Sequence, residues 1–281
     1  MPTIHTYTTS EAGLSVNAFL IETAHGVVAI DATLTNSDSL ALKKLVQSTG
    51  KPLLAILLTH GHPDHVAGVT NLVEDSSTPI ISLSSVKALM QQTEAAKHAQ
   101  WSGMFGEEWI RQWTYPNTIV KDGEAVQFDG ITYRVHDLGA GGDCDANSIW
   151  VMESGLSAAF VGDLVYNQHY SYMADGSILR WLANLERFRP LLSKHTLYIG
   201  HGKEGTVTLL DQQKEYFLTY CSTLLRLTKG SAHLDEATTQ QFVQQMEKDY
   251  PGYGLSFMIG LGASKVAQEL ANPSAVLVAA H

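Results

Sequence analysis

The sequence has few of the features that mark secreted and membrane proteins. It contains only two cysteines in 281 residues, too few for a disulfide framework. No apolar run approaches the ~20 residues that a membrane-spanning helix needs. The first residues, MPTIHTYTTSEAG, lack the basic start and apolar segment of a secretory signal. We therefore expect a cytoplasmic protein that makes no membrane contact.

Positive charge is also scarce. The sequence contains 18 Lys and Arg residues and 28 Asp and Glu residues, which gives a formal net charge of -10. A chain with this balance has no electrostatic footprint for nucleic acid, so we expect no nucleic-acid partner. The chain as a whole is 44% hydrophobic and 16% charged, a composition typical of a globular protein that buries a large core.

Short apolar runs alternate with amphipathic segments along much of the chain. The runs SVNAFLIET and GVVAIDATL, separated by AHG, predict a β-hairpin, and residues 37–49 have the apolar spacing of a helix. PLLAILLT is apolar throughout, which is typical of a strand buried on both faces. VQFDGITYRVHDLG predicts two strands joined at Asp129-Gly130, and Asp175 is expected to cap a helix that ends near Phe188. This alternation predicts an α/β sandwich.

Helical patterns dominate the last quarter of the chain. We expect residues 1–205 to form the core and residues 206–281 to form a helical C-terminal extension that packs on it, within a single structural domain. The apolar stripes of these helices would serve either to cover a pocket or to form a homodimer contact.

Four side chains with metal-binding chemistry follow the apolar strand, in the stretch LLTHGHPDHVAG. Imidazole nitrogens and carboxylate oxygens suit zinc, iron or manganese. In an extended segment alternate residues point the same way, so His60 and His62 can bind one ion. Asp64 and His65 lie one turn further and can face a second ion. The alternative is that some of these residues are surface or helix-capping groups.

The pattern His60-x-His62-x-Asp64-His65 resembles the metal-binding motif of the metallo-β-lactamase superfamily. Three further segments resemble family landmarks and occur in the expected order, so that the resemblance covers about residues 14–205. They are VVAIDATL with Asp31, AAFVGDLVY with Asp163, and YIGHGKEG with His201. The resemblance implies a four-layer αββα sandwich with a dinuclear metal site.

One landmark departs from the family pattern. The family usually places a third histidine in a Gly-x-Gly-His-Ser/Thr loop, and the corresponding stretch here is LGAGGDCDANSIW. Alignment of NSIW with the following strand puts Asp143 at the histidine position. Asp145 ranks second, Cys144 third, and His136 is assigned to the preceding strand. A carboxylate makes the site harder, which shifts its preference toward iron or manganese.

The resemblance implies two divalent metal ions, for which we expect zinc first and iron or manganese as alternatives. The residues expected at the site are His60, His62 and Asp143 on one ion, Asp64, His65 and His201 on the other, Asp163 shared between them, and Asp31 as outer support. A shared hydroxide would attack the substrate, and Asp64 would take up the proton.

Tyr166 lies three residues after Asp163, and in some lactone-hydrolysing members of the family a tyrosine near this place binds the substrate carbonyl. With His169 as a second substrate contact, we predict a hydrolase that acts on a small-molecule carbonyl ester, lactone or thioester. The alternatives are a β-lactam hydrolase, a phosphodiesterase, a mononuclear iron oxidoreductase acting on persulfides, and a non-catalytic metal-binding or regulatory domain.

Overall fold

The structure is a computed structural model that describes residues 1–73 and 75–272. It divides into two compact units. The first, which we call the N-terminal unit, comprises Met1–Asp137 and Ser148–Gly162. The second, which we call the C-terminal unit, comprises Leu138–Asn147 and the described residues from 163 to 272.

The N-terminal unit contains a six-stranded mixed sheet with the spatial order β1-β2-β3-β4-β5-β6. The first three strands are antiparallel, which confirms the predicted hairpin, and β3 to β6 are parallel. The apolar run before residues 60–65, which we call the histidine loop, forms the inner strand β4, as predicted. The strands are β1 (Thr3–Thr8), β2 (Asn17–Glu22), β3 (Val27–Ile30), β4 (Leu53–Leu57), β5 (Ile80–Leu83) and β6 (Thr118–Val120).

A second sheet in the same unit has the order β10-β9-β8-β7. The predicted turn at Asp129-Gly130 joins β7 to β8, and both of its residues have positive φ, as a tight hairpin turn requires. The strands are β7 (Ala125–Phe128), β8 (Ile131–Gly139), β9 (Asn147–Met152) and β10 (Ala158–Phe160).

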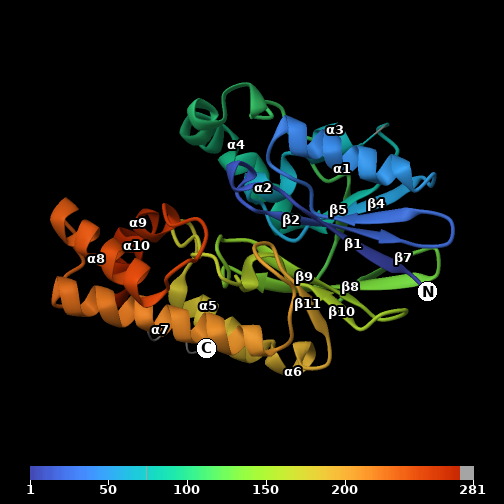
Figure 1. Ribbon diagram of the computed structural model, residues 1–281. Coiled ribbons are helices and arrows are strands. Elements are labelled where there is room, and N and C mark those ends of the chain that lie inside the picture. Colours follow the sequence, from blue (N-terminus) through green and yellow to red (C-terminus); the bar gives the residue numbers. More distant parts are fainter. Residues whose placement is uncertain (74, 273–281) are drawn as a thin grey trace. The chain divides into compact units, whose positions relative to one another are not determined.

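The two sheets of the N-terminal unit pack face to face, with helices on the outer side of the first sheet (Figure 1). Phe19 on β2 and Phe160 on β10 have ring centroids 5.4 Å apart, and Trp150 Nε1 donates to the carbonyl of Leu58 at 3.0 Å. The outer layer includes α1 (Asn36–Ser48) and α4 (Ser84–Phe105). These layers confirm the predicted α/β sandwich.

The C-terminal unit is built around the long helix α7, which packs on α5, α8 and α10 (Figure 1). Trp181 of α5 meets Phe217 of α7 with ring centroids 4.6 Å apart, and Tyr220 meets Phe242 at the same distance. The predicted C-terminal helices are therefore confirmed. The elements are α5 (Ile178–Arg187), α6 (Arg189–Leu192), β11 (Thr196–Tyr198), α7 (Thr208–Thr228), α8 (Glu236–Asp249), α9 (Met258–Leu261) and α10 (Ala263–Ala271).

The predicted start of helix α5 was wrong. Its N-cap is Ser177 rather than Asp175, because the Ser177 hydroxyl accepts from the backbone N–H of Arg180. The carboxylate of Glu269, on α10, accepts from the N–H groups of Ile178 and Leu179. Among the described residues, no helix combines the length and the apolar character that crossing a bilayer requires.

Candidate metal centre

The histidine loop occupies the end of β4 in the N-terminal unit. After Leu57 the chain runs outside any helix or strand to His62, which has extended backbone angles and is the N-cap of the short helix α2 (Pro63–Val66). His60, His62, Asp64 and His65 are 1%, 6%, 8% and 0% exposed. None of the four is a surface residue, so burial of this many polar groups in one loop requires partners for them.

The donor atoms of this loop lie at distances that suit metal binding. The rings of His60 and His62 have centroids 5.2 Å apart and are nearly perpendicular, and those of His60 and His65 have centroids 4.1 Å apart. Nε2 of His65 lies 3.8 Å from Oδ2 of Asp64. Two ligands that bind one tetrahedral ion at about 2.0–2.1 Å are separated by roughly 3.4 Å, so this pair needs little movement to share an ion.

Asp31, at the end of β3, supports the loop from behind. Its carboxylate accepts from the Thr59 N–H at 2.7 Å, from the Thr59 hydroxyl at 2.6 Å and from Nδ1 of His65 at 2.8 Å. The last bond places the proton of His65 on Nδ1, so that Nε2 is the nitrogen that this ring can offer to a metal. Ligand atoms of Asp31, His60 and His65 lie within 4.8 Å of one another, yet Asp31 already accepts three hydrogen bonds and is better placed as a support.

Gly162 is a residue that sequence reasoning missed. It directly precedes Asp163 and has a φ of +50°, and a Cβ here would lie 2.7 Å from the Thr59 hydroxyl and 3.3 Å from Nδ1 of His60. Any larger residue would push on the histidine loop. The available signal was the glycine in AAFVGDLVY, because a glycine beside a ligand often marks a close approach.

A second group of polar side chains gathers in the C-terminal unit. Asp143, Asp163, Tyr166 and His201 are all at most 5% exposed. Nε2 of His201 lies 3.3 Å from Oδ2 of Asp163, which is again close to the separation of two ligands on one ion. The rings of Tyr166 and His201 stack in parallel, with centroids 5.0 Å apart and an interplanar angle of 2°.

The hydroxyl of Tyr166 joins the two carboxylates of this group. It donates to Oδ2 of Asp163 at 2.5 Å and lies 3.5 Å from Oδ2 of Asp143. The structure thus places the carboxylates of Asp143 and Asp163 beside the same hydroxyl, and the replacement of the third histidine by Asp143 remains a prediction.

The other candidates in that part of the chain are placed differently. Asp145 is exposed. The thiol of Cys144 donates to the carbonyl of Ala146 at 3.5 Å and lies 3.4 Å from the side-chain oxygen of Asn147. His136 lies on β8, where burial lowers its pKa.

The loop that carries Asp143 is held by helix α5. The side-chain amide of Asn184 donates to the carbonyls of Leu138 and Gly141 at 2.7 and 3.0 Å. Gly176, just before α5, also touches the loop, because a Cβ there would lie 2.1 Å from the Gly142 carbonyl oxygen and 2.9 Å from the carbonyl carbon of Asp143.

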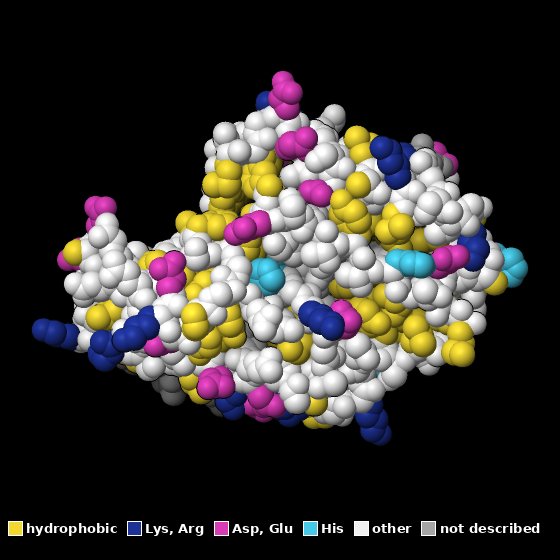
Figure 2. Space-filling view, viewed as in Figure 1, with side chains coloured by type: hydrophobic (Ala, Val, Ile, Leu, Met, Phe, Trp, Pro, Cys, Tyr) yellow, Lys and Arg dark blue, Asp and Glu magenta, His cyan; other side chains and the backbone are white. Residues whose placement is uncertain are grey.

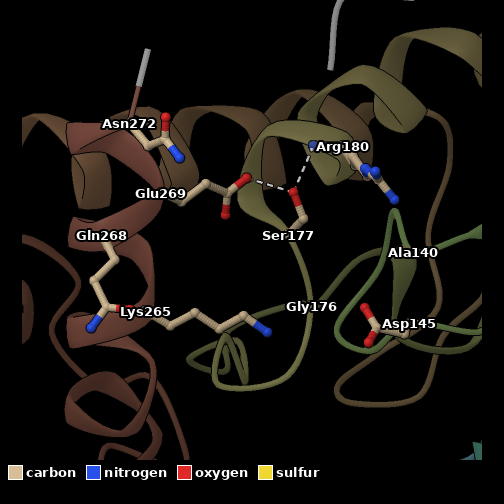
Figure 3. Close-up of a pocket in the computed structure, with 9 residues that line it drawn as sticks. All are labelled: Ala140, Asp145, Gly176, Ser177, Arg180, Lys265, Gln268, Glu269 and Asn272. Atoms are coloured by element: carbon tan, nitrogen blue, oxygen red, sulfur yellow. Dashed lines mark hydrogen bonds between the residues drawn. The ribbon is translucent and has the colours of Figure 1, made fainter. Parts of the chain in front are cut away.

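A pocket of about 440 Å³ lies beside this loop, between Ala140, the start of α5 and helix α10 (Figure 3). Glu269 closes one side of it, because its carboxylate accepts from Ser177 Oγ at 2.5 Å and is bound to the first turn of α5. The pocket therefore belongs to the scaffold that supports the loop.

His169 lies close to the second group. Its Nδ1 donates to the carbonyl of Asn167 at 2.9 Å, and its ring packs against Gly254, where a Cβ would be only 2.6 Å away. The ring centroids of His169 and His201 are 6.4 Å apart. The loop between α8 and α9 therefore fixes the orientation of His169.

The donor sets of both units fit divalent transition metals. Each set combines imidazole nitrogen with carboxylate oxygen, the ligand types that bind zinc, iron and manganese. Each set is buried, and each contains an Asp–His pair at 3.3–3.8 Å. On the face shown in Figure 2, Lys and Arg side chains lie singly or in small groups among acidic ones.

Comparison with known proteins gives independent evidence on the family and the fold of the chain. Residues 12–201 match the family described as the metallo-beta-lactamase superfamily. A beta-lactamase-like protein 2 homolog from Caenorhabditis elegans is 23% identical over 239 residues, which cover 84% of this chain and 72% of that protein. The crystal structure of BLEG-1 B3 metallo-beta-lactamase, 18% identical, superposes with a TM-score of 0.63 over 76% of this chain and 99% of its own. TTHA1623, crystallised in a di-iron-bound form, is 26% identical with a TM-score of 0.59, over 75% of this chain and 99% of its own.

Proposed function

The chain belongs to the metallo-β-lactamase superfamily, and from this premise we propose that it hydrolyses a carbonyl ester, a lactone or a thioester with the help of two divalent metal ions. Membership of the superfamily supports a metal-dependent hydrolase in general. The single observation that carries the proposal is that each unit holds a buried Asp–His pair close to the separation of two ligands on one ion.

We propose that the two donor groups act together, as the family motif implies. The proposed ligands are His60, His62 and Asp143 for one ion, Asp64, His65 and His201 for the other, and Asp163 for both. Zinc is our first choice of metal, in line with the imidazole-rich set. Iron is the second, because Asp143 adds a hard oxygen donor and the related TTHA1623 has been crystallised with two irons.

Ions held by these donors would supply an activated water nucleophile and Lewis-acid stabilisation of the oxyanion that develops on the substrate. The residues of the chain contribute position and proton transfer. Asp31 fixes the tautomer of His65 through the 2.8 Å bond to Nδ1. Asp64, whose side chain is 11% exposed, is our proposed proton acceptor during breakdown of the tetrahedral intermediate.

Two observations bear on the proposed small-molecule substrate. His169, held by Asn167 and Gly254, stands next to His201 and is our proposed substrate contact. The acidic balance of the chain disfavours polyanionic substrates, and on the face shown in Figure 2 the basic side chains are dispersed. The cytoplasmic location, the absence of a nucleic-acid or membrane partner and the homodimer remain predictions.

The test combines metal analysis with a substrate panel. We expect protein purified without chelator to contain about two metal equivalents and to hydrolyse a lactone, ester or thioester. His62→Ala should lose metal and activity together, whereas the matched control His25→Ala, at a ring that is 82% exposed, should keep both.

Three outcomes would contradict the proposal. A single iron with persulfide oxidation would assign the protein to the oxidoreductases of this fold. Hydrolysis restricted to phosphodiesters or β-lactams would replace the substrate class. Full metal loading with background rates on every substrate would indicate a metal-binding or regulatory domain.

A further inference from the structure

One phenol hydroxyl serves two carboxylates in the C-terminal unit. The Tyr166 O–H donates to Asp163 at 2.5 Å, and Oδ2 of Asp143 lies 3.5 Å from the same oxygen. All three side chains are buried, with exposures of 5%, 3% and 0% for Tyr166, Asp163 and Asp143. Because water is largely excluded here, the repulsion between the Asp143 and Asp163 carboxylates and their hydrogen bonds to the phenol are stronger than they would be at the surface.

The carboxylate at position 143 creates a problem that the usual family ligand avoids. A neutral imidazole beside Asp163 carries no charge, whereas the carboxylate of Asp143 repels that of Asp163. A hydroxyl donor placed between two carboxylates offsets part of this repulsion, because hydrogen bonds to ionised oxygens are about twice as strong as neutral ones. Tyr166 occupies that place.

Tyr166 is held in position without any help from a substrate. Its ring stacks on His201 and also faces Trp181, with centroids 6.2 Å apart. Its backbone N–H donates to Oε1 of Gln213 at 2.7 Å, and the Gln213 amide in turn donates to the Ser171 hydroxyl at 2.9 Å. Gln213 lies on α7 and is 2% exposed, so a helix of the C-terminal extension fixes where the hydroxyl stands.

We propose that Tyr166 is a positioning residue whose role depends on the carboxylate at position 143: it holds Asp143 and Asp163 in a shared arrangement in which both bind metal. Asp143 and Tyr166 therefore compensate for each other. The single O–H of this phenol is directed at the two carboxylates, at shorter distance to Asp163, so the expected donation to a substrate carbonyl is not its resting role. This inference rests on the proposed function only in taking the two carboxylates as metal ligands.

A double-mutant cycle on metal affinity tests the proposal. Apo protein is titrated with Zn²⁺ in competition with a chromophoric chelator, for the wild type, Tyr166→Phe, Asp143→His and the double variant. We expect Tyr166→Phe to lower the affinity of the weaker zinc by about 10- to 100-fold in the wild-type background, as loss of an outer hydrogen bond to a ligand does. In the Asp143→His background the same change should lower zinc affinity by a smaller factor, because only the bond to Asp163 is lost there and no second carboxylate repels it.

Controls separate positioning from general structural damage. Tyr170→Phe removes another phenol of the same unit, which donates to the Tyr250 carbonyl at 2.8 Å, and should leave zinc affinity unchanged. The melting temperature of each apo variant is recorded, since a purely structural role would shift it by the same amount in both backgrounds. If Asp143→His fails to fold, Asp143→Asn, a neutral residue of the same shape, replaces it in the cycle.

The outcomes distinguish the two proposals. A loss of zinc affinity of the same size in both backgrounds would overturn the compensation between Asp143 and Tyr166. Unchanged zinc affinity in Tyr166→Phe together with a lower kcat or a higher KM would also overturn it. Tyr166 would then be a substrate contact, as expected from the sequence. If the wild-type protein binds no zinc, iron or manganese, the proposed function itself is contradicted.

Discussion

At the scale of single residues, the buried Asp31–His65 pair is the clearest link between structure and chemistry. Three donors converge on one carboxylate at 2.6–2.8 Å, and one of them is a predicted metal ligand. A similar pair lies on the surface, where Asp129 contacts Nδ1 of His25 at 2.8 Å. Comparing variants of the two pairs separates two contributions to zinc affinity. One comes from support of a buried metal ligand, and the other from an Asp–His contact as such.

We expect Asp31→Asn to lower metal affinity by about 10- to 100-fold, because the neutral amide polarises the His65 ring less and no longer fixes its tautomer. The measurement is chelator competition with Zn²⁺. Asp129→Asn is the matched control and should leave zinc affinity within about 2-fold of the wild type. Equal losses in the two variants would show that the effect does not come from support of the metal ligand.

His136 gives a pH prediction. Burial lowers its pKa, and the charge of Asp122 opposes that effect. The unfolded chain therefore takes up this proton at a higher pH than the folded protein, so stability is lost as the pH falls from the ordinary value of about 6.5 toward the lowered pKa. In apo protein, His136→Gln should reduce the fall in melting temperature between pH 7.5 and pH 5.5, whereas His233→Gln, at an exposed histidine, should not.

At the scale of elements, the loop that carries Asp143 depends on its neighbours more than on its own sequence. Asn184 binds two of its carbonyls, and Gly176 allows the start of α5 to approach its backbone. The carboxylate of Glu269 fixes the same end of α5. The position of Asp143 thus follows from helices that lie 30 or more residues further along the chain.

Gly176→Ala should disturb this loop directly. The new Cβ would meet the backbone of Gly142 and Asp143, which cannot rotate away as a side chain would, so we expect a loss of about 1–3 kcal/mol in unfolding free energy. Metal content should fall as well, because Asp143 must shift. Urea denaturation and metal analysis check both effects.

Gly103→Ala is the matched control for this change. Gly103 lies inside α4 and its Cβ would have open space around it. The protein should become up to about 1 kcal/mol more stable, because alanine favours helices over glycine. Wild-type stability and metal content in Gly176→Ala would show that the loop is not held by this contact.

At the scale of the whole molecule, the C-terminal helices are integral to the unit that holds Asp143, Asp163 and His201. Phe217 of α7 packs on Trp181 at 4.6 Å, and Gln213 holds the backbone of Tyr166. A chain that ended at residue 205 would expose the apolar face of α5 and leave the Tyr166 N–H without its acceptor. The expected boundary at residue 205 remains a prediction, and it can be tested directly.

We expect the fragment 1–205 to be insoluble or to lack cooperative unfolding, because it loses the apolar partners that α7 supplies. The measurement is soluble yield together with a thermal melt followed by circular dichroism, with the full chain prepared in parallel. A soluble fragment that melts cooperatively and binds zinc would show that the core folds without the extension.

Local patterns in the sequence were enough to predict much of this protein. The hairpin β2–β3, the inner strand β4 and the turn at Asp129-Gly130 follow from periodicity and turn chemistry. His60, His62, Asp64 and His65 were recognisable because all four lie within six residues, so that the motif is complete in one loop. Features whose residues are neighbours in the sequence can be predicted without the tertiary structure.

The remaining features were decided by contacts between distant parts of the chain. Sequence proposed Asp143 by alignment, but only the fold showed the Tyr166 hydroxyl next to both Asp143 and Asp163. Helix α5 begins at Ile178, where Ser177 is the N-cap and Glu269, 91 residues later, accepts from the first N–H group of the helix. The steric need for glycine at position 162 likewise arises from Thr59. Such contacts cannot be predicted from the periodicity of the sequence. Their partners lie far apart along the chain and meet only when hydrophobic burial folds it.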